Sequence, residues 1–268
     1  MKNSEKDGLR QDVRKRYGEI AKQNGSCCGN SGCCSQAPGS AGASAGLGYS
    51  GEEISAVPEG ADMGLGCGNP QAIAQLRAGE AVLDLGCGGG FDCFLAARRV
   101  GESGRVIGVD MTPEMVSKAR ENARKGQYHN VEIRLGEIEH LPVADACVDV
   151  IMSNCVINLS PDKQQVFRDA FRVLRENGRL AVSDIVAVKP LPEKILKDPD
   201  ALSGCVAGAA LVNDVKNMLR DAGFVDVSVE VREDSTRFLR DWFPGSGAEE
   251  YVRSAMITAR KPIHGDEG

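Results

Sequence analysis

The chain has 268 residues, a formal net charge of −6 and an aromatic content of 4%. This length suits one large domain, alone or with a small appendage, and the acidic charge without a basic stripe argues against a nucleic-acid-binding protein. The charged first residues predict no signal peptide, and no apolar run is long enough to predict a transmembrane helix. We therefore expect a cytoplasmic protein, without nucleic-acid or membrane partners, that is a monomer.

Residues 1–79 are predicted to form a helix, a linker and a loop. Apolar side chains recur at helical spacing within residues 9–23, which predicts a helix. Residues 24–48 consist mainly of Gly, Ser, Ala and Cys, a composition typical of a flexible linker. Residues 50–54 suit one helical turn, and residues 57–68 suit a loop. Asn69 and Pro70 then predict the start of a short helix that runs to about residue 76.

From residue 80 onward, short apolar runs alternate with helical segments. The predicted strands are residues 81–85, 105–110, 131–135, 147–153, 179–188, 224–231 and 251–260. The predicted helices are residues 91–100, 112–125, 160–178, 202–211 and 213–222. Each strand–helix–strand alternation predicts a right-handed crossover and parallel strands. We expect an α/β core over residues 80–232, with residues 189–211 as an insertion. Residues 233–268 are predicted to be a short segment with a closing strand.

A glycine-rich turn follows the first predicted strand. The run Asp84-Leu85-Gly86-Cys87-Gly88-Gly89-Gly90 lies between a strand and a helix, and the second strand ends in Asp110. Glycines allow a tight turn close to a ligand, and an acid at the end of the second strand can bind ribose hydroxyls. A nicotinamide dinucleotide is one candidate cofactor. The acid Asp84 disfavours an anionic pyrophosphate and favours a cofactor that carries a positive charge.

The run Asp84-x-Gly-x-Gly-x-Gly resembles the first motif of class I S-adenosylmethionine methyltransferases. The resemblance implies a Rossmann-like fold with a mainly parallel seven-stranded sheet, helices on both faces, and S-adenosylmethionine as cofactor. The cofactor-binding residues that it implies are Asp84, Gly86, Cys87, Gly88, Gly90, Asp110, Met111, Glu137, Ile138 and Asn154.

Three of the ten cysteines are isolated in short stretches of small or polar residues: Cys67, Cys155 and Cys205. Soft thiolate ligands select soft ions. An isolated cysteine is more often a small buried apolar residue, and we expect that packing role for Cys87, Cys93 and Cys147.

The sequences around two of these cysteines make the resemblance more specific. Residues 64–70 (Gly-Leu-Gly-Cys-Gly-Asn-Pro), 108–115 and 153–163 resemble the arsenite methyltransferases of microbial type, over residues 9–230. The resemblance implies that Cys67, Cys155 and Cys205 bind trivalent arsenic, and that the arsenic lone pair attacks the sulfonium methyl. It also implies arsenite or its thiol conjugates as substrate, a thiol reductant such as glutathione or thioredoxin, and a role in arsenic detoxification.

Two other functions stay open at this point. The chain could be a class I methyltransferase for a small organic acceptor, which would leave the three isolated cysteines unexplained. It could also be a metal-sequestering protein without turnover, which would leave the cofactor motif unexplained. A further four cysteines, Cys27, Cys28, Cys33 and Cys34, lie within eight residues of the predicted linker. We expect Cys27 or Cys28 to participate in arsenic binding.

Overall fold

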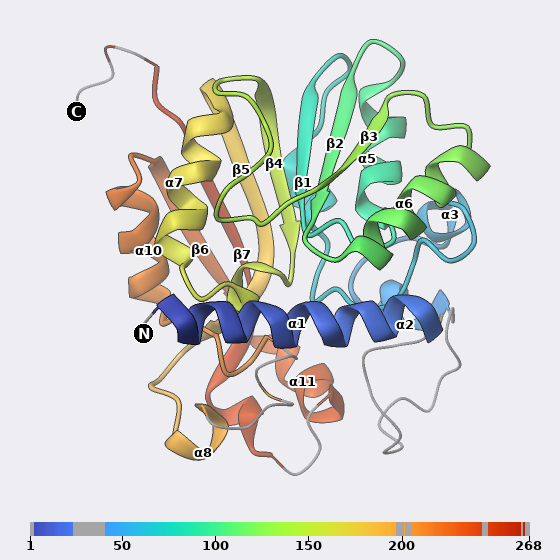
Figure 1. The fold of residues 1–268 in the computed structure, drawn as a ribbon. Coiled ribbons are helices and arrows are strands. Elements are labelled where there is room, and N and C mark those ends of the chain that lie inside the picture. The colour runs from blue at the N-terminus through green and yellow to red at the C-terminus, as the bar shows by residue number, and fades with distance from the viewer. Residues whose placement is uncertain are drawn as a thin grey trace.

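A seven-stranded sheet forms the centre of the protein (Figure 1). The computed structural model describes residues 3–23, 41–196, 201, 205–242, 246–263 and 265. The strands are β1 (Ala81–Leu85), β2 (Arg105–Asp110), β3 (Val131–Leu135), β4 (Val148–Asn154), β5 (Leu174–Ala187), β6 (Val225–Arg232) and β7 (Val252–Arg260). Their order is β3-β2-β1-β4-β5-β7-β6, and β7 is antiparallel to both of its neighbours. The predicted α/β fold with a mainly parallel sheet is therefore confirmed.

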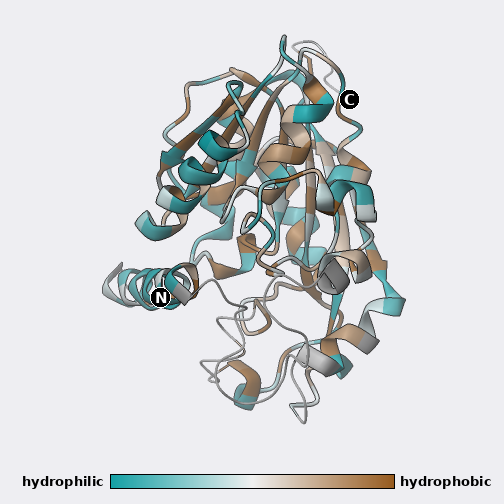
Figure 2. Ribbon diagram, turned by 90° about the vertical axis from the view of Figure 1, so that its right-hand side faces the viewer, coloured by the Kyte–Doolittle hydropathy of each residue, from teal (hydrophilic) through white to brown (hydrophobic). Residues whose placement is uncertain are grey.

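Helices cover both faces of this sheet. The longer ones are α1 (Asn3–Gln23), α5 (Phe91–Val100), α6 (Pro113–Lys125), α7 (Lys163–Val173) and α10 (Val212–Asp221). The short ones are α2 (Ala41–Gly46), α3 (Gly51–Ser55), α4 (Pro70–Ala74), α8 (Glu193–Leu196) and α11 (Thr236–Trp242). Successive side chains of β1 point to opposite faces, so that Val82 packs with α5 and α6 while Leu83 packs with α7. Figure 2 shows the resulting pattern of apolar strands inside and polar helix surfaces outside.

Most predicted elements agree closely with the structure. The bounds of β1, β2, β3, α5 and α6 match their predictions, and the side chain of Asn69 caps α4 by accepting from the Ala72 amide at 3.3 Å. The first helix is longer than predicted and begins at Asn3. The predicted closing strand is β7, which pairs with both β5 and β6. The division of the chain at residues 80 and 233 stays a prediction.

The helix predicted over residues 160–178 differs from the structure. Helix α7 begins after Asp162, whose side chain accepts from the Gln165 amide at 3.2 Å, and ends at Val173. Asn177 and Gly178 lie within β5 instead, and Asn177 has a φ of 60°. Leu174 is fully buried and pairs with Val148, so the extended conformation begins at residue 174, before the predicted end of the helix. Asn177 and Gly178 then form an irregular stretch within strand β5.

The segment before α10 also differs from its prediction. Instead of a helix over residues 202–211, the described residues from Cys205 onward form turns, and α10 is preceded by Leu211 rather than capped by Asn213. Residues 24–40 of the predicted linker lie outside the described residues, and so do Cys27, Cys28, Cys33 and Cys34. The remainder of that linker includes the short helix α2.

Helix α1 crosses the sheet at the carboxyl ends of the parallel strands (Figure 1). Arg10 forms an ion pair with Glu139 at 3.1 Å, and Lys6 forms one with Asp162 at 2.6 Å. Near its other end, Ile20 packs against the buried Met115 of α6. Ligands bind at the carboxyl ends of the strands in open α/β sheets, so α1 covers the region where a site is expected. Within the described residues, no helix has the length and apolar character needed to cross a membrane.

Candidate active site

The glycine-rich turn between β1 and α5 forms one wall of a cavity. The amide of Gly86 donates to the Val109 carbonyl at 2.7 Å, which holds the turn against β2. Gly86 has a φ of +68°, and an added Cβ would lie 2.4 to 2.6 Å from the methyl carbons of Val156, so only glycine fits there. At Gly88, with a φ of +50°, an added Cβ would meet no atom within 4 Å. The turn therefore presents bare backbone to open space.

The cavity has a volume of about 130 Å³ and lies where β1, β2 and β4 end. The predicted site residues that line it are Asp84, Gly86, Cys87, Gly88, Asp110, Met111, Ile138, Asn154 and Cys155. Residues of α1, including Arg10 and Tyr17, form part of its wall. Helix α1 therefore covers one side of the cavity.

Two predicted cofactor residues do not line this cavity. Gly90 has a φ of +93° and precedes α5, where an added Cβ would collide with the Phe94 ring at 2.6 Å. Glu137 accepts from Arg14 of α1 at 3.2 Å. Its place in the wall is taken by Glu139, which is 3% exposed and accepts from the Ser160 hydroxyl at 2.8 Å.

The cavity is strongly acidic. Burial raises the pKa values of Asp84, Asp92 and Asp110, and the charge of Asp92 raises that of Asp84 further. Among the described residues that line the cavity, Arg10 is the one basic side chain. Buried carboxylates without matching cations are unfavourable, so a ligand that brings positive charge fits this wall. An ammonium and a sulfonium near Asp84 and Asp92, with hydroxyls near Asp110, match S-adenosylmethionine.

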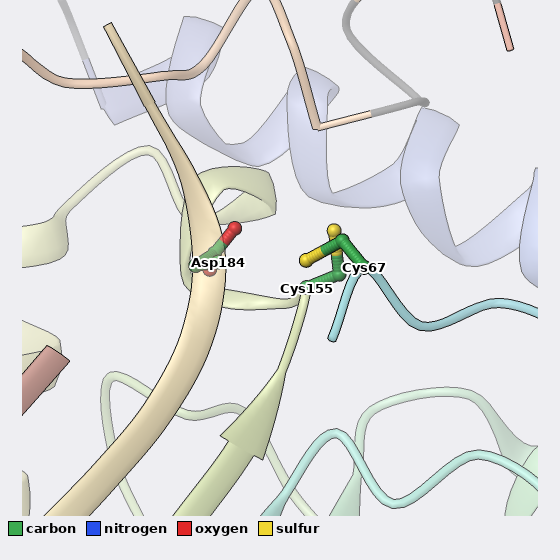
Figure 3. Close-up of side chains that lie close together, drawn as sticks. All are labelled: Cys67, Cys155 and Asp184. Carbon is green, nitrogen blue, oxygen red and sulfur yellow. The ribbon is translucent and has the colours of Figure 1, made fainter. Parts of the chain in front are cut away.

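Cys67, Cys155 and Cys205 come together beside this cavity from three separate segments. All three are buried, at 2%, 4% and 2% exposure, within one apolar cluster. The ligand atoms of Cys67, Cys155 and Asp184 lie within 4.8 Å of one another. Figure 3 shows these three side chains close together. The thiol of Cys205 donates to the carbonyl oxygen of Cys155 at 2.8 Å. The fold thus brings together Cys67 and Cys155, which are 88 residues apart in the sequence, and Cys155 and Cys205, which are 50 residues apart.

The backbone around the thiols depends on close approaches. An added Cβ at Gly66 would lie 2.6 Å from Asn154 Nδ2, and one at Gly68 would collide with the Ser183 hydroxyl. These two glycines let the segment that carries Cys67 lie directly on β4 and β5. The Cys155 amide donates to the Ser183 carbonyl at 2.8 Å, so residues of β5 support two of the three thiols.

Burial disfavours the charged forms of two of these thiols and of a neighbouring acid. Burial raises the pKa of Cys67 to about 11, and burial together with the neighbouring Cys205 and Cys67 raises the pKa of Cys155. Burial also raises the pKa of Asp184 to about 6. Burial lowers the pKa of Lys163, an ammonium that stands near Asp184 and Cys205. An acceptor that bonds to Cys67 and Cys155 must therefore displace the protons of these two thiols.

A hydrogen-bonded network joins the cofactor cavity to Cys67. The Tyr49 hydroxyl donates to Asp92 Oδ1 at 2.8 Å, and Asn154 Nδ2 donates to the Tyr49 oxygen at 3.1 Å. On its other side, Asn154 Oδ1 accepts from the Cys67 amide at 3.0 Å. Burial, together with the charge of Asp92, raises the pKa of Tyr49 well above its usual range.

Sequence reasoning missed Tyr49, Asp92 and Asp184. A signal existed for the two acids, because an acid inside a strongly apolar strand or just after a glycine turn is seldom buried without a role. Asp184 follows Val182 and Ser183 in β5, and Asp92 lies in the first turn of α5. No such signal existed for Tyr49, because its contacts lie more than 40 residues away in sequence.

The cysteines expected to have packing roles differ in burial. Cys93 is fully buried and its thiol donates to Asp84 Oδ2 at 3.2 Å, while Cys87 is 7% exposed and lines the cavity. Cys147 is partly exposed at the start of β4 and packs against the core.

Comparisons with known proteins agree with this geometry. Residues 76–223 match the methyltransferase domain family. The chain is 54% identical to an arsenite methyltransferase of Halobacterium salinarum, over 96% of this chain and 68% of that protein. It is 38% identical to an arsenite methyltransferase of Aquipseudomonas alcaligenes, over 81% of this chain and 62% of that protein. Among solved structures, an arsenic(III) S-adenosylmethionine methyltransferase from Chlamydomonas reinhardtii matches with a TM-score of 0.60 and 36% identity, over 82% of this chain and 73% of that chain.

Proposed function

The chain belongs to the arsenite methyltransferase family, and on that premise we propose that it transfers methyl groups from S-adenosylmethionine to trivalent arsenic bound by Cys67, Cys155 and Cys205. The observation that carries the proposal is the position of Cys155. Cys155 lines the cofactor cavity, and its sulfur lies within 4.8 Å of that of Cys67. An acceptor bound to these thiols would therefore lie next to the cofactor.

The three thiols would bind arsenic by exchange with the hydroxides of arsenite. Each thiol forms a sulfur–arsenic bond and gives up its proton, which leaves with one hydroxide as water. Because the thiols are buried, the bound arsenic is kept from bulk water. Three sulfur bonds leave arsenic with a lone pair, and soft thiolates suit this soft element.

S-adenosylmethionine, when bound, would supply an electrophilic methyl carbon for that lone pair. The arsenic–carbon bond would form as the bond between this carbon and the sulfonium sulfur breaks, and S-adenosylhomocysteine would leave. Asp84 and Asp92 would hold its positive groups, and Asp110 its ribose hydroxyls. Gly86, Cys87 and Gly88 would lie against it with backbone atoms, and Met111, Ile138 and Asn154 would complete the wall. Positioning the acceptor close to the methyl group is the main demand of such a transfer.

Two further parts of the proposal rest on the resemblance of the sequence to arsenite methyltransferases. A thiol reductant, glutathione or thioredoxin, would serve as co-substrate. Cys27 or Cys28, which lie outside the described residues, would participate in arsenic binding. A variant with Cys27, Cys28, Cys33 and Cys34 all replaced by Ser should methylate arsenite more slowly. Wild-type rates of mono- and dimethylation in that variant would remove these cysteines from the proposal.

Mass-spectrometric speciation of arsenic tests the proposed function. The purified protein is incubated with arsenite, S-adenosylmethionine and glutathione, beside the variants Cys155→Ser and Cys147→Ser. Cys147 is the matched control, because it is a cysteine outside the thiol cluster. We expect methylated arsenic from the wild type and from Cys147→Ser, and none from Cys155→Ser.

Other outcomes would select another function. If the wild type binds S-adenosylhomocysteine but forms no methylated arsenic, the acceptor is a small organic molecule. If it binds arsenite in stoichiometric amount without turnover, it is a sequestering protein. Methylation by Cys155→Ser at the wild-type rate would exclude Cys155 as a ligand.

A further inference from the structure

We propose that Tyr49, Asp92 and Asn154 are positioning residues that couple the cofactor site to the arsenic site, so that a bound cofactor strengthens arsenite binding. The inference rests on the proposed function. It concerns how the two sites communicate, which the established activity of a methyltransferase does not require.

Asn154 occupies the junction between the two sites. It is the last residue of β4 and directly precedes Cys155. Its two side-chain N–H groups face three acceptors, the Gly68 carbonyl at 2.9 Å, the Tyr49 oxygen at 3.1 Å and Asp92 Oδ2 at 3.3 Å, so one N–H is shared between two of them. Its side-chain oxygen accepts from the Cys67 amide. One amide group thus contacts both residues 67 and 68 and the acid of the cofactor cavity.

The direction of the Asn154 amide is determined by these partners. All three groups that face its nitrogen carry oxygen, and the group that faces its oxygen is an N–H. Rotating the amide by half a turn would oppose oxygen to oxygen at the carbonyl of Gly68 and the carboxylate of Asp92. Only the orientation with Oδ1 toward residue 67 offers an acceptor to the Cys67 amide. The Asp92 carboxylate favours this orientation because it accepts a hydrogen bond from Asn154 Nδ2.

Tyr49 connects the same acid to the same amide by a second route. It is 4% exposed, and its ring packs edge-on against Phe91 with centroids 4.8 Å apart. Its hydroxyl donates its single proton to Asp92, so its oxygen is available to accept from Asn154. Gln71 donates to the Asp92 backbone carbonyl at 2.8 Å, which ties the start of α5 to α4, the helix that follows the loop with Cys67.

A cationic cofactor would act on this network through charge. Asp92 and Asp84 are buried together in the cavity wall, and their mutual repulsion disfavours two full charges. A cofactor ammonium beside them stabilises the charged carboxylate of Asp92, which then accepts more strongly from Tyr49 and Asn154. The tightened network holds Cys67 in place before arsenic arrives. Since less ordering remains for the second ligand, the two ligands bind with positive coupling.

The test measures the affinity of the full chain for arsenite with and without saturating S-adenosylhomocysteine, which carries the ammonium but has no methyl to transfer. Equilibrium dialysis with elemental analysis of arsenic gives both dissociation constants. Couplings between sites are commonly about 5- to 150-fold. We expect roughly tenfold tighter arsenite binding in the presence of S-adenosylhomocysteine, and the reciprocal gain in S-adenosylhomocysteine affinity when arsenite is bound.

Three variants distinguish a loss of coupling between the two sites from a general loss of ligand affinity. Tyr49→Phe removes one hydroxyl and should lower the ratio of the two arsenite affinities to about threefold or less, and Asp92→Asn should bring it close to one. Tyr128→Phe is the matched control, since its hydroxyl donates to the Ala56 carbonyl, away from the cavity; its ratio should equal that of the wild type. A purely structural role would weaken both arsenite affinities and leave their ratio unchanged.

Three outcomes would overturn the inference. A wild-type ratio of one, with arsenite and S-adenosylhomocysteine both bound, would exclude coupling and leave the proposed function intact. A ratio in Tyr49→Phe and Asp92→Asn equal to that of the wild type would exclude these residues as its carriers. If the wild type binds no more arsenite than Cys155→Ser does, the proposed function fails, and the inference fails with it.

Discussion

The thiol of Cys205 lies 2.8 Å from the carbonyl oxygen of Cys155, to which it donates a hydrogen bond, and both residues have a left-handed backbone, with φ values of 65° and 59°. Non-glycine residues adopt this conformation at a cost of about 1 to 2 kcal/mol. Two strained cysteines in one small cluster indicate that the surrounding fold imposes the arrangement, as is common at functional sites.

This strain predicts an unusual order of stability among variants of Cys155. The free energy of unfolding should be about 1 kcal/mol higher for Cys155→Gly than for Cys155→Ser, because glycine adopts a positive φ without strain. Both variants should lose arsenite binding equally. Urea unfolding followed by circular dichroism measures the difference. A serine variant as stable as the glycine variant would show that the backbone at residue 155 is unstrained.

The close approach of Gly66 to Asn154 predicts a selective defect. An added methyl group would lie 2.6 Å from Asn154 Nδ2, so Gly66→Ala should weaken arsenite binding by about tenfold or more, corresponding to roughly 1.4 kcal/mol. S-adenosylhomocysteine affinity should fall much less. Gly8→Ala is the control, since no atom lies near an added Cβ there; as an exposed helix position it should gain up to about 1 kcal/mol in stability. Equal arsenite affinity in Gly66→Ala and the wild type would contradict the close packing.

The buried acids of the cavity predict a pH dependence of cofactor binding. Burial raises the pKa values of Asp84 and Asp92, and a cationic ligand favours their charged forms. As pH falls below their raised pKa values, binding must first remove protons, so the affinity for S-adenosylhomocysteine should decrease by up to about tenfold per pH unit for each proton released. Titration calorimetry in buffers of different ionisation enthalpy measures that release. An affinity independent of pH between 5 and 8 would argue against ionised acids at the ligand.

The ion pairs of α1 predict its effect on ligand exchange. Arg10 is largely buried and pairs with Glu139, which lines the cavity, whereas Lys22 pairs with Glu114 at the surface. Arg10→Gln should loosen α1 and speed dissociation of S-adenosylhomocysteine several-fold, because breaking a pair with a buried acid leaves that acid without its partner. Lys22→Gln should change little, since surface pairs contribute about 0 to 1 kcal/mol. Stopped-flow displacement measures both rates, and equal rates in the two variants would contradict the covering role of α1.

Local patterns in the chain determined most of the fold. The apolar run of residues 81–85 and the glycine-rich turn after it predict a buried strand followed by a tight turn. The length of the run, its apolar side chains and the glycines of the turn all favour that structure. The same holds for α6, which begins with Pro113 and ends before Gly126. The failure at residues 174–178 has a local cause as well: Asn-Gly is a helix stop by propensity, and the pairing of Leu174 with Val148 is visible only in the folded sheet.

The proposal that Cys67, Cys155 and Cys205 bind arsenic rests on their isolated positions and on the resemblance, since thiolates are ligands for soft elements. Their meeting point depended on tertiary structure, because Gly66 and Gly68 let the Cys67 segment lie on Asn154 and Ser183, and the Cys205 thiol bonds to the Cys155 carbonyl. Tyr49, Asp92 and Asp184 entered the site for the same reason. Hydrogen bonds between residues far apart in the chain have no periodicity for a sequence to display, so only the packing of β4, β5 and the start of α5 could reveal them.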